Sequence, residues 1–506
     1  AEDAPDALAI IEGVPDADAR RQWTYAEFEV ECERVAKALL ARFEPGDHIV
    51  VWAQNIPEWV MLEFGIAMAG MVIVTANPAY QQSELTYVLN QSKAKGLFLV
   101  DSYRGNPMLA IATDAQPDCP ELRDIIRIAD WDDFLAGAND DTALPEVAPL
   151  DPVMIQYTSG TTGFPKGALL HHRGLINNAH HFITRMGLAP GDVYVTAMPL
   201  FHTSGSAMAV CGTASLRAAQ VLVETFEPGL VLELTETYRS AGMVAVPTML
   251  IAMLEHESFA TRDLSCLKGV CSGGSLVPEH LVRTFEKELG APFTIVFGQT
   301  ECSPVATMTK PDDTIDDKSS TIGSPMPHTE IKIVDPATGD TVPPGTVGEL
   351  CVRGYLVMHE YFDMPEQTAE AIDAQGWLHT GDLAAMDDRG YCTVEGRLKD
   401  MIIRGGENID PKELEELLFT HASVGGVAVV GLPDDKWGET VAAFIRPAPG
   451  ASVDKKELFG HVREHLAPHK TPKHWFAVEE FPLTGSGKIQ KFILRQQWVD
   501  GEHIEL

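Results

Sequence analysis

One ten-residue segment concentrates side chains that can hold phosphate. It reads Thr158-Ser-Gly-Thr-Thr-Gly-Phe-Pro-Lys166-Gly167 and directly follows a short apolar run, Val153 to Tyr157. Glycines let the backbone approach an anion closely, while hydroxyls and exposed backbone N–H groups donate to phosphate oxygens. The Walker A pattern is excluded, because Pro165 precedes the lysine and a glycine follows it. A flexible surface loop is the alternative, which this density of donors after a buried strand disfavours.

Five further segments combine glycine with charged or hydroxyl side chains. They are Ser272-Gly-Gly-Ser275, Phe297-Gly-Gln-Thr-Glu301, Trp377-Leu-His-Thr-Gly-Asp382, Gly396-Arg-Leu-Lys-Asp-Met-Ile-Ile-Arg-Gly-Gly-Glu-Asn-Ile409 and Pro482-Leu-Thr-Gly-Ser-Gly-Lys488-Ile. Taken singly, Glu301 reads as a solvated acid, Asp382 as a turn residue and Lys488 as a solvated lysine. In this order, the segments resemble the signature motifs of the adenylate-forming superfamily. That superfamily includes acyl-CoA synthetases, firefly luciferase and nonribosomal peptide adenylation domains.

The resemblance implies that an acid attacks the α-phosphorus of ATP and leaves as an acyl-adenylate with release of pyrophosphate. Charge builds on the phosphoryl group, so the protein must supply cations and preorganised donors. By the family pattern, Glu301 and Thr158 would hold Mg²⁺, and Asp382 and Arg397 would contact the ribose. The other expected ATP and AMP contacts are Ser159, Gly160, Thr161, Thr162, Gly163, Lys166, Gly273, Gly274, Ser275, Phe297, Gly298, Gln299 and Thr300.

The resemblance implies that the C-terminal part of the chain acts first in adenylation and then in the second half-reaction, with coenzyme A. Lys488 would bridge the substrate carboxylate and the α-phosphate, a task that suits a compact ammonium with three donors. Rotation about a hinge at Lys399 would then bring Gly405 and Gly406 to a pantetheine tunnel, where glycine permits close passage. A helix C-cap or a hairpin turn is the ordinary interpretation of two glycines. Trp437 is expected either to touch CoA or to pack locally.

The segment Pro199-Leu-Phe-His-Thr-Ser204 indicates which class of carboxylic acid is the substrate. Amino-acid adenylation domains place an aspartate after this phenylalanine, and here the position is His202. An unpaired buried ammonium is costly, so an α-amino acid substrate is disfavoured. His202 is expected to gate the acyl pocket or to position the carboxylate, with a core histidine as the alternative. The uncharged lining that follows suits an aliphatic or aryl acid, with Thr203, Gly205 and Met208 as pocket residues.

The predicted function is therefore an AMP-forming acyl-CoA ligase that uses ATP, Mg²⁺ and CoA. Within the superfamily, the sequence most resembles the medium-chain fatty acyl-CoA ligases. An aryl or other carboxylic acid CoA ligase, an enzyme that loads a carrier protein and a non-enzymatic nucleotide sensor remain as alternatives.

Composition narrows the possible partners. The chain has 506 residues, 45% of them hydrophobic, and 73 acidic against 38 basic residues give a net charge of −35. Such a surface repels phosphate backbones, which disfavours nucleic acid as a partner. No uninterrupted apolar run reaches the length of a transmembrane helix. Eight cysteines without a C-x-x-C pair suit a reducing compartment, which predicts the cytoplasm, or an organelle matrix if a targeting peptide was removed. A homodimer is possible.

The elements that must position these residues alternate between strand and helix in the first part of the chain. Apolar runs at 48–53, 72–75 and 96–100 with helical segments between them predict parallel strands with crossovers. Asn55 is expected to begin one of these helices and Ser83 another. From about 321 to 396 short β-like pieces with frequent Gly and Pro predict an antiparallel module, and the last hundred residues a compact α+β unit.

The expected fold class is α/β. A large N-terminal body, residues 1–396, would include the β-rich extension at about 321–396, and a small, mobile α+β cap domain would span 397–506 with its hinge at 397–400.

Overall fold

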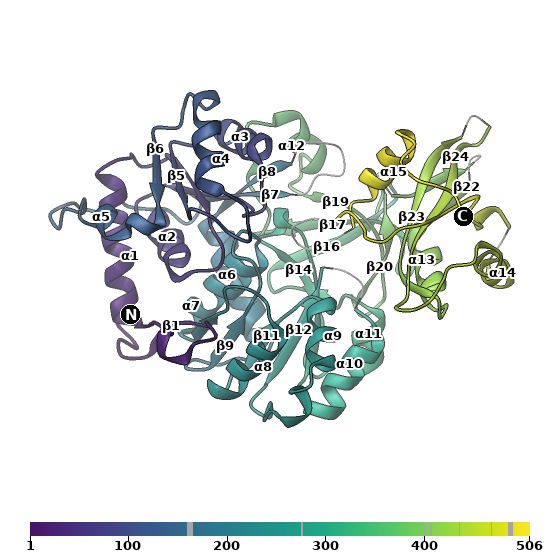
Figure 1. Cartoon of the computed structure of the whole chain (residues 1–506), viewed down its shortest axis with the longest axis horizontal. Coiled ribbons are helices and arrows are strands. Elements are labelled where there is room, and N and C mark those ends of the chain that lie inside the picture. The colour runs from purple at the N-terminus through teal and green to yellow at the C-terminus, as the bar shows by residue number, and fades with distance from the viewer. Residues whose placement is uncertain are drawn as a thin grey trace.

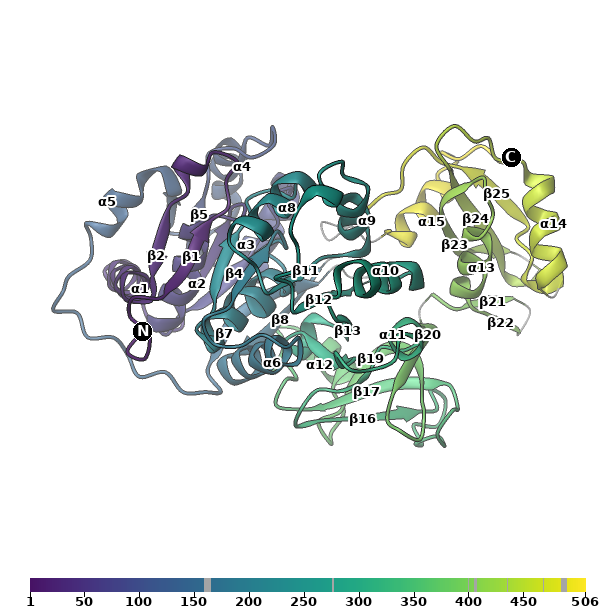
Figure 2. The same ribbon diagram turned by 90° about the horizontal axis from the view of Figure 1, so that it is seen from below.

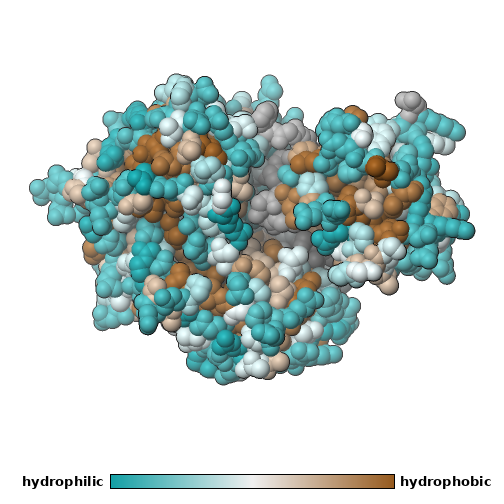
Figure 3. Space-filling view, viewed as in Figure 1, coloured by the Kyte–Doolittle hydropathy of each residue, from teal (hydrophilic) through white to brown (hydrophobic). Residues whose placement is uncertain are grey.

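The computed structural model describes residues 1–158, 165–274, 277–398, 400–404, 407–434, 436–466, 468–483 and 489–506. These residues form a large mixed α/β body and a smaller C-terminal unit, which stands at one side of the body in Figure 1. Hydrophilic residues predominate over the face shown in Figure 3, with hydrophobic areas on both parts. Among the described helices, none combines the length and the hydrophobicity needed to span a bilayer.

The first sheet of the body has seven strands in the order β18-β8-β7-β4-β3-β5-β6. Their bounds are β18 Glu360–Tyr361, β8 Lys166–His171, β7 Pro152–Thr158, β4 Val72–Thr75, β3 His48–Trp52, β5 Gly96–Leu99 and β6 Asp124–Arg127. Strands β3 to β7 run parallel, as the alternation of strands and helices predicts. At one side of the sheet, β8 pairs antiparallel with β7 and the edge strand β18 pairs antiparallel with β8.

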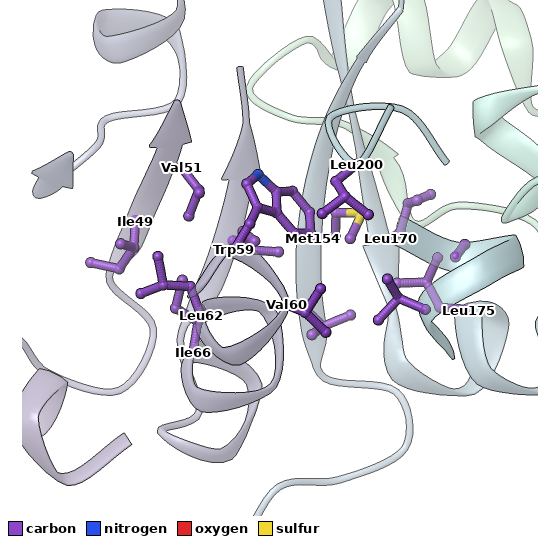
Figure 4. Close-up of a cluster of buried hydrophobic side chains, with 14 of the residues drawn as sticks. Ile49, Val51, Trp59, Val60, Leu62, Ile66, Met154, Leu170, Leu175 and Leu200 are labelled. Atoms are coloured by element: carbon purple, nitrogen blue, oxygen red, sulfur yellow. The ribbon is translucent and has the colours of Figure 1, made fainter. Parts of the chain in front are cut away.

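Alternate residues of the central strand β3 serve two cores, because successive side chains point to opposite faces of a sheet. Ile49 and Val51 pack in the cluster that contains α1 and α2, whereas Val50 and Trp52 pack with α3 and α4. Figure 4 shows the first of these cores, where Trp59 of α2 lies beside Met154 of β7 and Leu200. The helices of this half are α1 Tyr25–Leu40, α2 Pro57–Met68, α3 Gln82–Gln91, α4 Met108–Ala115 and α5 Trp131–Leu135.

The second sheet of the body has nine strands in the order β15-β14-β13-β12-β11-β9-β10-β1-β2. Their bounds are β15 Ser324–Pro325, β14 Val305–Met308, β13 Phe293–Gly298, β12 Gly269–Gly273, β11 Gly242–Val244, β9 Val193–Thr196, β10 Ala219–Leu222, β1 Leu8–Glu12 and β2 Gln22–Thr24. The accompanying helices are α6 His172–Arg185, α7 Gly212–Leu216, α8 Pro228–Thr237, α9 Pro247–Glu255, α10 Glu279–Thr284 and α11 Ile315–Ser320.

The antiparallel module is a four-stranded sheet in the order β16-β17-β19-β20, which Figure 2 shows at the lower edge of the molecule. The strands are β16 Thr329–Val334, β17 Gly348–Gly354, β19 Leu378–Met386 and β20 Cys392–Arg397, and helix α12 Pro365–Ala371 precedes β19. Two short strands of the same segment, β15 and β18, pair instead with strands of the body. The segment therefore also completes the two larger sheets.

The C-terminal unit is a five-stranded sheet with helices, as its α+β pattern predicts. Its strands run in the order β22-β21-β24-β23, and β25 pairs with β24. The bounds are β21 Ile402–Arg404, β22 Glu407–Ile409, β23 Val424–Asp434, β24 Gly438–Pro447, β25 His474–Ala477, α13 Pro411–Phe419, α14 Lys455–His465 and α15 Lys491–Val499. Strand β20 ends at Arg397, so this residue belongs structurally to the four-stranded sheet.

Two expected helix starts are wrong. Helix α2 begins at Pro57 with Ile56 as its N-cap, because proline is pre-organised for the first helical position. Asn55 is buried and instead donates to the carbonyls of Met198 and Val223, which ties the two large sheets together. Helix α3 begins at Gln82 and is capped by Gln81 rather than Ser83, because Glu84 reaches back to the Gln81 backbone N–H.

Candidate active site

The phosphate-type segment connects two antiparallel strands. Thr158 ends β7 and Lys166 begins β8, the two residues face each other in register, and the Thr158 hydroxyl donates to the Lys166 carbonyl at 3.3 Å. A P-loop instead joins a strand to a helix, so the hairpin agrees with the exclusion of Walker A. Five predicted contacts lie outside the described residues: Ser159, Gly160, Thr161, Thr162 and Gly163.

Tyr361 brings Lys166 and Glu301 together. Glu301 lies in the short helix η7, Thr300–Cys302, which packs against β7 and β8. The Tyr361 hydroxyl donates to Glu301 Oε1 at 2.6 Å, and Lys166 Nζ lies 3.8 Å from the centroid of the Tyr361 ring. Burial and then the Glu301 charge raise the pKa of Tyr361 well above its usual value, so the phenol keeps its proton and donates it.

Sequence analysis did not identify Tyr361. It reaches the site only because β18 pairs with β8, where Tyr361 lies opposite Ala168. A two-residue strand in a segment rich in turns carries no periodic pattern that would reveal this pairing. A Tyr between Glu360 and Phe362 has no distinguishing sequence context.

Asp382 stands at the centre of a second group. It is 4% exposed, and its Oδ1 accepts from Arg397 Nε at 2.9 Å while its Oδ2 accepts from Gln299 Nε2 at 2.8 Å. The strand register places Asp382 directly opposite Arg397. A carboxylate oxygen has two lone pairs, so each can accept one more hydrogen bond from a diol. Three predicted motifs therefore converge on one carboxylate.

The glycine turn and the following motif lie at neighbouring strand ends. Gly273 ends β12 and Gly298 ends β13, two parallel strands that pair with each other. A Cβ on Gly273 would come 2.3 Å from the Val296 carbonyl oxygen, so only glycine allows this approach. Ligands of open α/β sheets bind outside the carboxyl ends of the strands. Gly274, Phe297 and Thr300 adjoin these ends, while Ser275 lies outside the described residues.

His202 precedes a buried, uncharged helical segment. The Ser204 backbone N–H donates to His202 Nδ1 at 3.1 Å, so a neutral ring carries its proton on Nε2. The following π-helix η4, Ser204–Cys211, is buried throughout and contains Gly205 and Met208, and Thr203 is 1% exposed. Such π-turns are frequent at functional sites.

One buried acid, Glu63, lies beside the end of η4. Glu63 of α2 lies 3.8 Å from Cys211 Sγ at the end of η4. Burial raises the pKa of Glu63 well above its usual value, which favours the uncharged form of the carboxyl group. An uncharged interior beside η4 is compatible with an apolar ligand.

The predicted C-terminal site residues are only partly described. Lys399, Gly405, Gly406 and Lys488 lie outside the described residues. Trp437 is 42% exposed in the turn before β24, with Lys436 Nζ 4.7 Å and the Arg404 guanidinium carbon 5.9 Å from its ring centroid. The indole is thus a partly exposed aromatic surface flanked by two cations.

Comparison with known proteins decides the family. The model of the "AMP-binding enzyme" family matches residues 1–362, and that of the "AMP-binding enzyme C-terminal domain" matches residues 413–488. The chain belongs to the AMP-binding enzyme family. The adenylate-forming superfamily that the sequence motifs predict is thereby confirmed.

Individual members of the family resemble the chain over nearly its whole length. A putative acyl-CoA synthetase, YngI of Bacillus subtilis, is 41% identical over 98% of this chain and 95% of its own. The mitochondrial medium-chain acyl-CoA ligase ACSF2 of Rattus norvegicus is 34% identical over 95% of this chain and 84% of its own. The ATP-bound structure of MatB from Rhodopseudomonas palustris superposes with a TM-score of 0.88 at 29% identity, covering 98% of this chain and 96% of MatB. These similarities confirm the expected α/β fold with a separate C-terminal domain and an enzyme that ligates an acid to CoA with cleavage of ATP to AMP.

Proposed function

We propose that this AMP-binding enzyme activates a medium-chain fatty acid as its acyl-adenylate in a Mg²⁺-dependent step and then transfers the acyl group to CoA. The observation that carries the choice of acid is the buried segment η4 behind His202, which contains no charged residue. Apolar lining offers an alkyl chain favourable burial and offers an ammonium no counter-ion. Similarity to ACSF2, a medium-chain acyl-CoA ligase, supports the same acid.

In the first half-reaction, Glu301 and Thr158 would hold Mg²⁺. A carboxylate and a hydroxyl are the hard oxygen donors that this ion prefers, and the Tyr361 hydrogen bond fixes the orientation of the carboxylate. The bound ion would neutralise charge on the phosphates. Lys166 adds a positive charge on the same side, because its ammonium lies over the Tyr361 ring.

The group around Asp382, with Gln299 and Arg397, would bind the ribose of the nucleotide. Asp382 accepts the two ribose hydroxyls while Gln299 and Arg397 hold its carboxylate in place. The ends of β12 and β13 line the base and phosphates through Gly273, Gly274, Ser275, Phe297, Gly298 and Thr300. The Nε2–H of His202 would donate to the substrate carboxylate, or gate the acyl pocket formed with Thr203, Gly205 and Met208.

The C-terminal residues would act in both half-reactions. Lys488 bridges the carboxylate and the α-phosphate during adenylation, and rotation at Lys399 then exposes the carbonyl to the thiol of CoA. Gly405 and Gly406 line the pantetheine path and Trp437 contacts CoA. The scheme keeps the expected domains, residues 1–396 and 397–506 with the hinge at 397–400, although Arg397 still belongs to β20. All eight cysteines are free thiols, which suits the cytoplasm or an organelle matrix.

A panel of acids tests the proposal. Straight-chain, branched and aromatic acids are each assayed for ATP–pyrophosphate exchange and for CoA-dependent release of AMP, with and without Mg²⁺. We expect both activities to peak at medium-chain straight acids and to need Mg²⁺. A peak at aromatic acids would make the enzyme an aryl-CoA ligase, and pyrophosphate exchange without CoA-dependent turnover would favour a carrier protein as the acceptor. No exchange with any acid would overturn the proposal. Light scattering on the same sample shows whether it is a homodimer.

A further inference from the structure

Three potential metal ligands meet on one face of the four-stranded sheet. Cys351 of β17 lies opposite His379 of β19 in the strand register, and Glu349 lies two residues before Cys351 on the same face. Cys351 Sγ is 3.5 Å from His379 Nδ1, and Glu349 Oε2 is 2.7 Å from the same nitrogen. Across the described residues, this is the one group of three or more Cys, His, Asp or Glu side chains whose ligand atoms all lie within 4.8 Å of one another.

The spacing fits a tetrahedral ion. Zn²⁺ binds sulfur at about 2.3 Å and nitrogen or oxygen at about 2.0 Å, which places ligand atoms about 3.4 Å apart in a tetrahedron. The Cys351–His379 distance of 3.5 Å already matches this value. The His379–Glu349 contact of 2.7 Å must open by a fraction of an ångström, which a side-chain torsion allows.

An independent feature supports ligation by His379. Its other ring nitrogen, Nε2, lies 3.9 Å from Asp373 Oδ2. Metal-binding histidines commonly direct the second ring nitrogen at a carboxylate, which fixes the ring and its tautomer. Asp373 is itself held in place by the backbone N–H groups of Gln375 and Trp377. The carboxylate is therefore positioned before any ion binds.

The positively charged side chains near the cluster, Lys332 and Arg353, are directed at Trp377 rather than at the three ligand atoms. Lys332 Nζ lies 4.5 Å from the Trp377 ring centroid, and the Arg353 guanidinium carbon lies 4.4 Å from it. Both positive charges thus rest on the indole beside the cluster. Cys351 packs with Trp377 and Val334 in a small buried cluster. Trp377 is the one aromatic side chain of this cluster.

We propose that Glu349, Cys351 and His379 form a binding site for a thiophilic divalent cation such as Zn²⁺, distinct from the Mg²⁺ site at Glu301. The Cys351 thiol loses its proton to solvent as the metal–sulfur bond forms. Without an ion, His379 Nδ1–H donates to Glu349 Oε2. On binding, Nδ1 releases this proton to solvent and Nε2 takes one up, so that the neutral ring binds the ion through Nδ1 and carries its proton on Nε2, facing Asp373. Soft thiolate together with imidazole and carboxylate favours zinc-like ions over Mg²⁺.

An ion bound at this site changes the hydrogen bonds of the neighbouring turn at Thr380 and Gly381. Glu349 Oε1 accepts the backbone N–H of Gly381 at 3.0 Å, and the Thr380 hydroxyl donates to the Leu350 carbonyl at 2.7 Å. The same turn leads into Asp382. When the ion draws the Glu349 carboxylate away, the turn loses the first of these two hydrogen bonds to β17. Asp382 is then held less firmly, and nucleotide binding weakens. This consequence rests on the proposed ribose-binding role of Asp382.

Cobalt(II) is the probe for the metal site, because thiolate ligation gives a charge-transfer band that carboxylate and imidazole ligation do not. The chelator-treated full chain is titrated with Co²⁺, alongside Cys351→Ala and His379→Gln. Cys392→Ala is the matched control, since Cys392 is equally buried in the same sheet but belongs to the core cluster on its other face. Melting curves establish that each variant is folded.

We expect the band to saturate at one equivalent in the wild type and in Cys392→Ala, to vanish in Cys351→Ala and to need more Co²⁺ in His379→Gln. Absence of the band in the wild type, or its persistence in Cys351→Ala, overturns the site. Calorimetry of AMP binding with one equivalent of Zn²⁺ tests the coupling. We expect weaker AMP binding in the wild type but not in Cys351→Ala, and equal AMP binding would overturn the coupling. Neither the band nor AMP binding depends on catalytic turnover, so an inactive enzyme would refute the proposed function without touching the metal site.

Discussion

The Tyr361→Phe substitution isolates the hydrogen bond that orients Glu301. It removes the phenol O–H that lies 2.6 Å from Glu301 Oε1 and keeps the ring under Lys166 Nζ. A hydrogen bond to a charged group contributes about 1.5–3 kcal/mol. At about 1.4 kcal/mol per factor of ten, its loss lowers the rate of adenylation by about 10- to 100-fold if the orientation of Glu301 matters fully in the transition state.

The assay is ATP–pyrophosphate exchange over a range of Mg²⁺ concentrations. We expect Tyr361→Phe to need more Mg²⁺ and to reach a lower maximum. Tyr361→Leu also removes the ring beneath Lys166, so it should fall further. Tyr391→Phe is the matched control, because its hydroxyl also donates to a carboxylate, Asp313, at 2.6 Å but touches none of the site residues. Exchange by Tyr361→Phe equal to wild type, or an equal loss in Tyr391→Phe, would refute the reasoning.

Four further substitutions test other parts of the molecule. Lys488→Ala should abolish pyrophosphate exchange and spare transfer from preformed acyl-AMP to CoA, and equal loss of both would contradict its role. Gly406→Leu should block CoA use while exchange stays measurable, and loss of exchange as well would overturn the tunnel assignment. Gly205→Ala would place a Cβ 2.3 Å from the Pro199 carbonyl oxygen, so we expect a lower melting temperature and weaker acid binding than in the wild type, which equal melting curves would contradict. Burial first, and then His359, lowers the pKa of His171 from 6.5 to about 4, so this residue stabilises the fold by about 3 kcal/mol above pH 6.5 and loses that contribution as the pH falls towards 4. The melting temperature of His171→Asn should therefore fall less steeply than that of the wild type over this interval, and parallel curves would refute the assignment.

The strands and helices of the body were largely predictable because their patterns are local. The apolar runs at 48–53, 72–75 and 96–100 became β3, β4 and β5, paired in parallel as the intervening helices require. Helix ends were less predictable. Asn55 was expected to begin α2, yet its amide bridges the two large sheets, a role that depends on residues more than 140 positions away.

The sequence by itself determined the chemistry that is encoded in short segments. The motif ending at Glu301, the turn at Asp382 and the hairpin residues Thr158 and Lys166 each lie within a few consecutive residues, so their types and spacing identify the family. Only the tertiary structure decided how these segments meet. Gln299 reaches Asp382 across 83 positions and Tyr361 reaches Glu301 across 60, the second of these because β18 pairs with β8, a strand from much earlier in the chain. Such pairings follow from the packing of whole sheets, which local patterns do not encode.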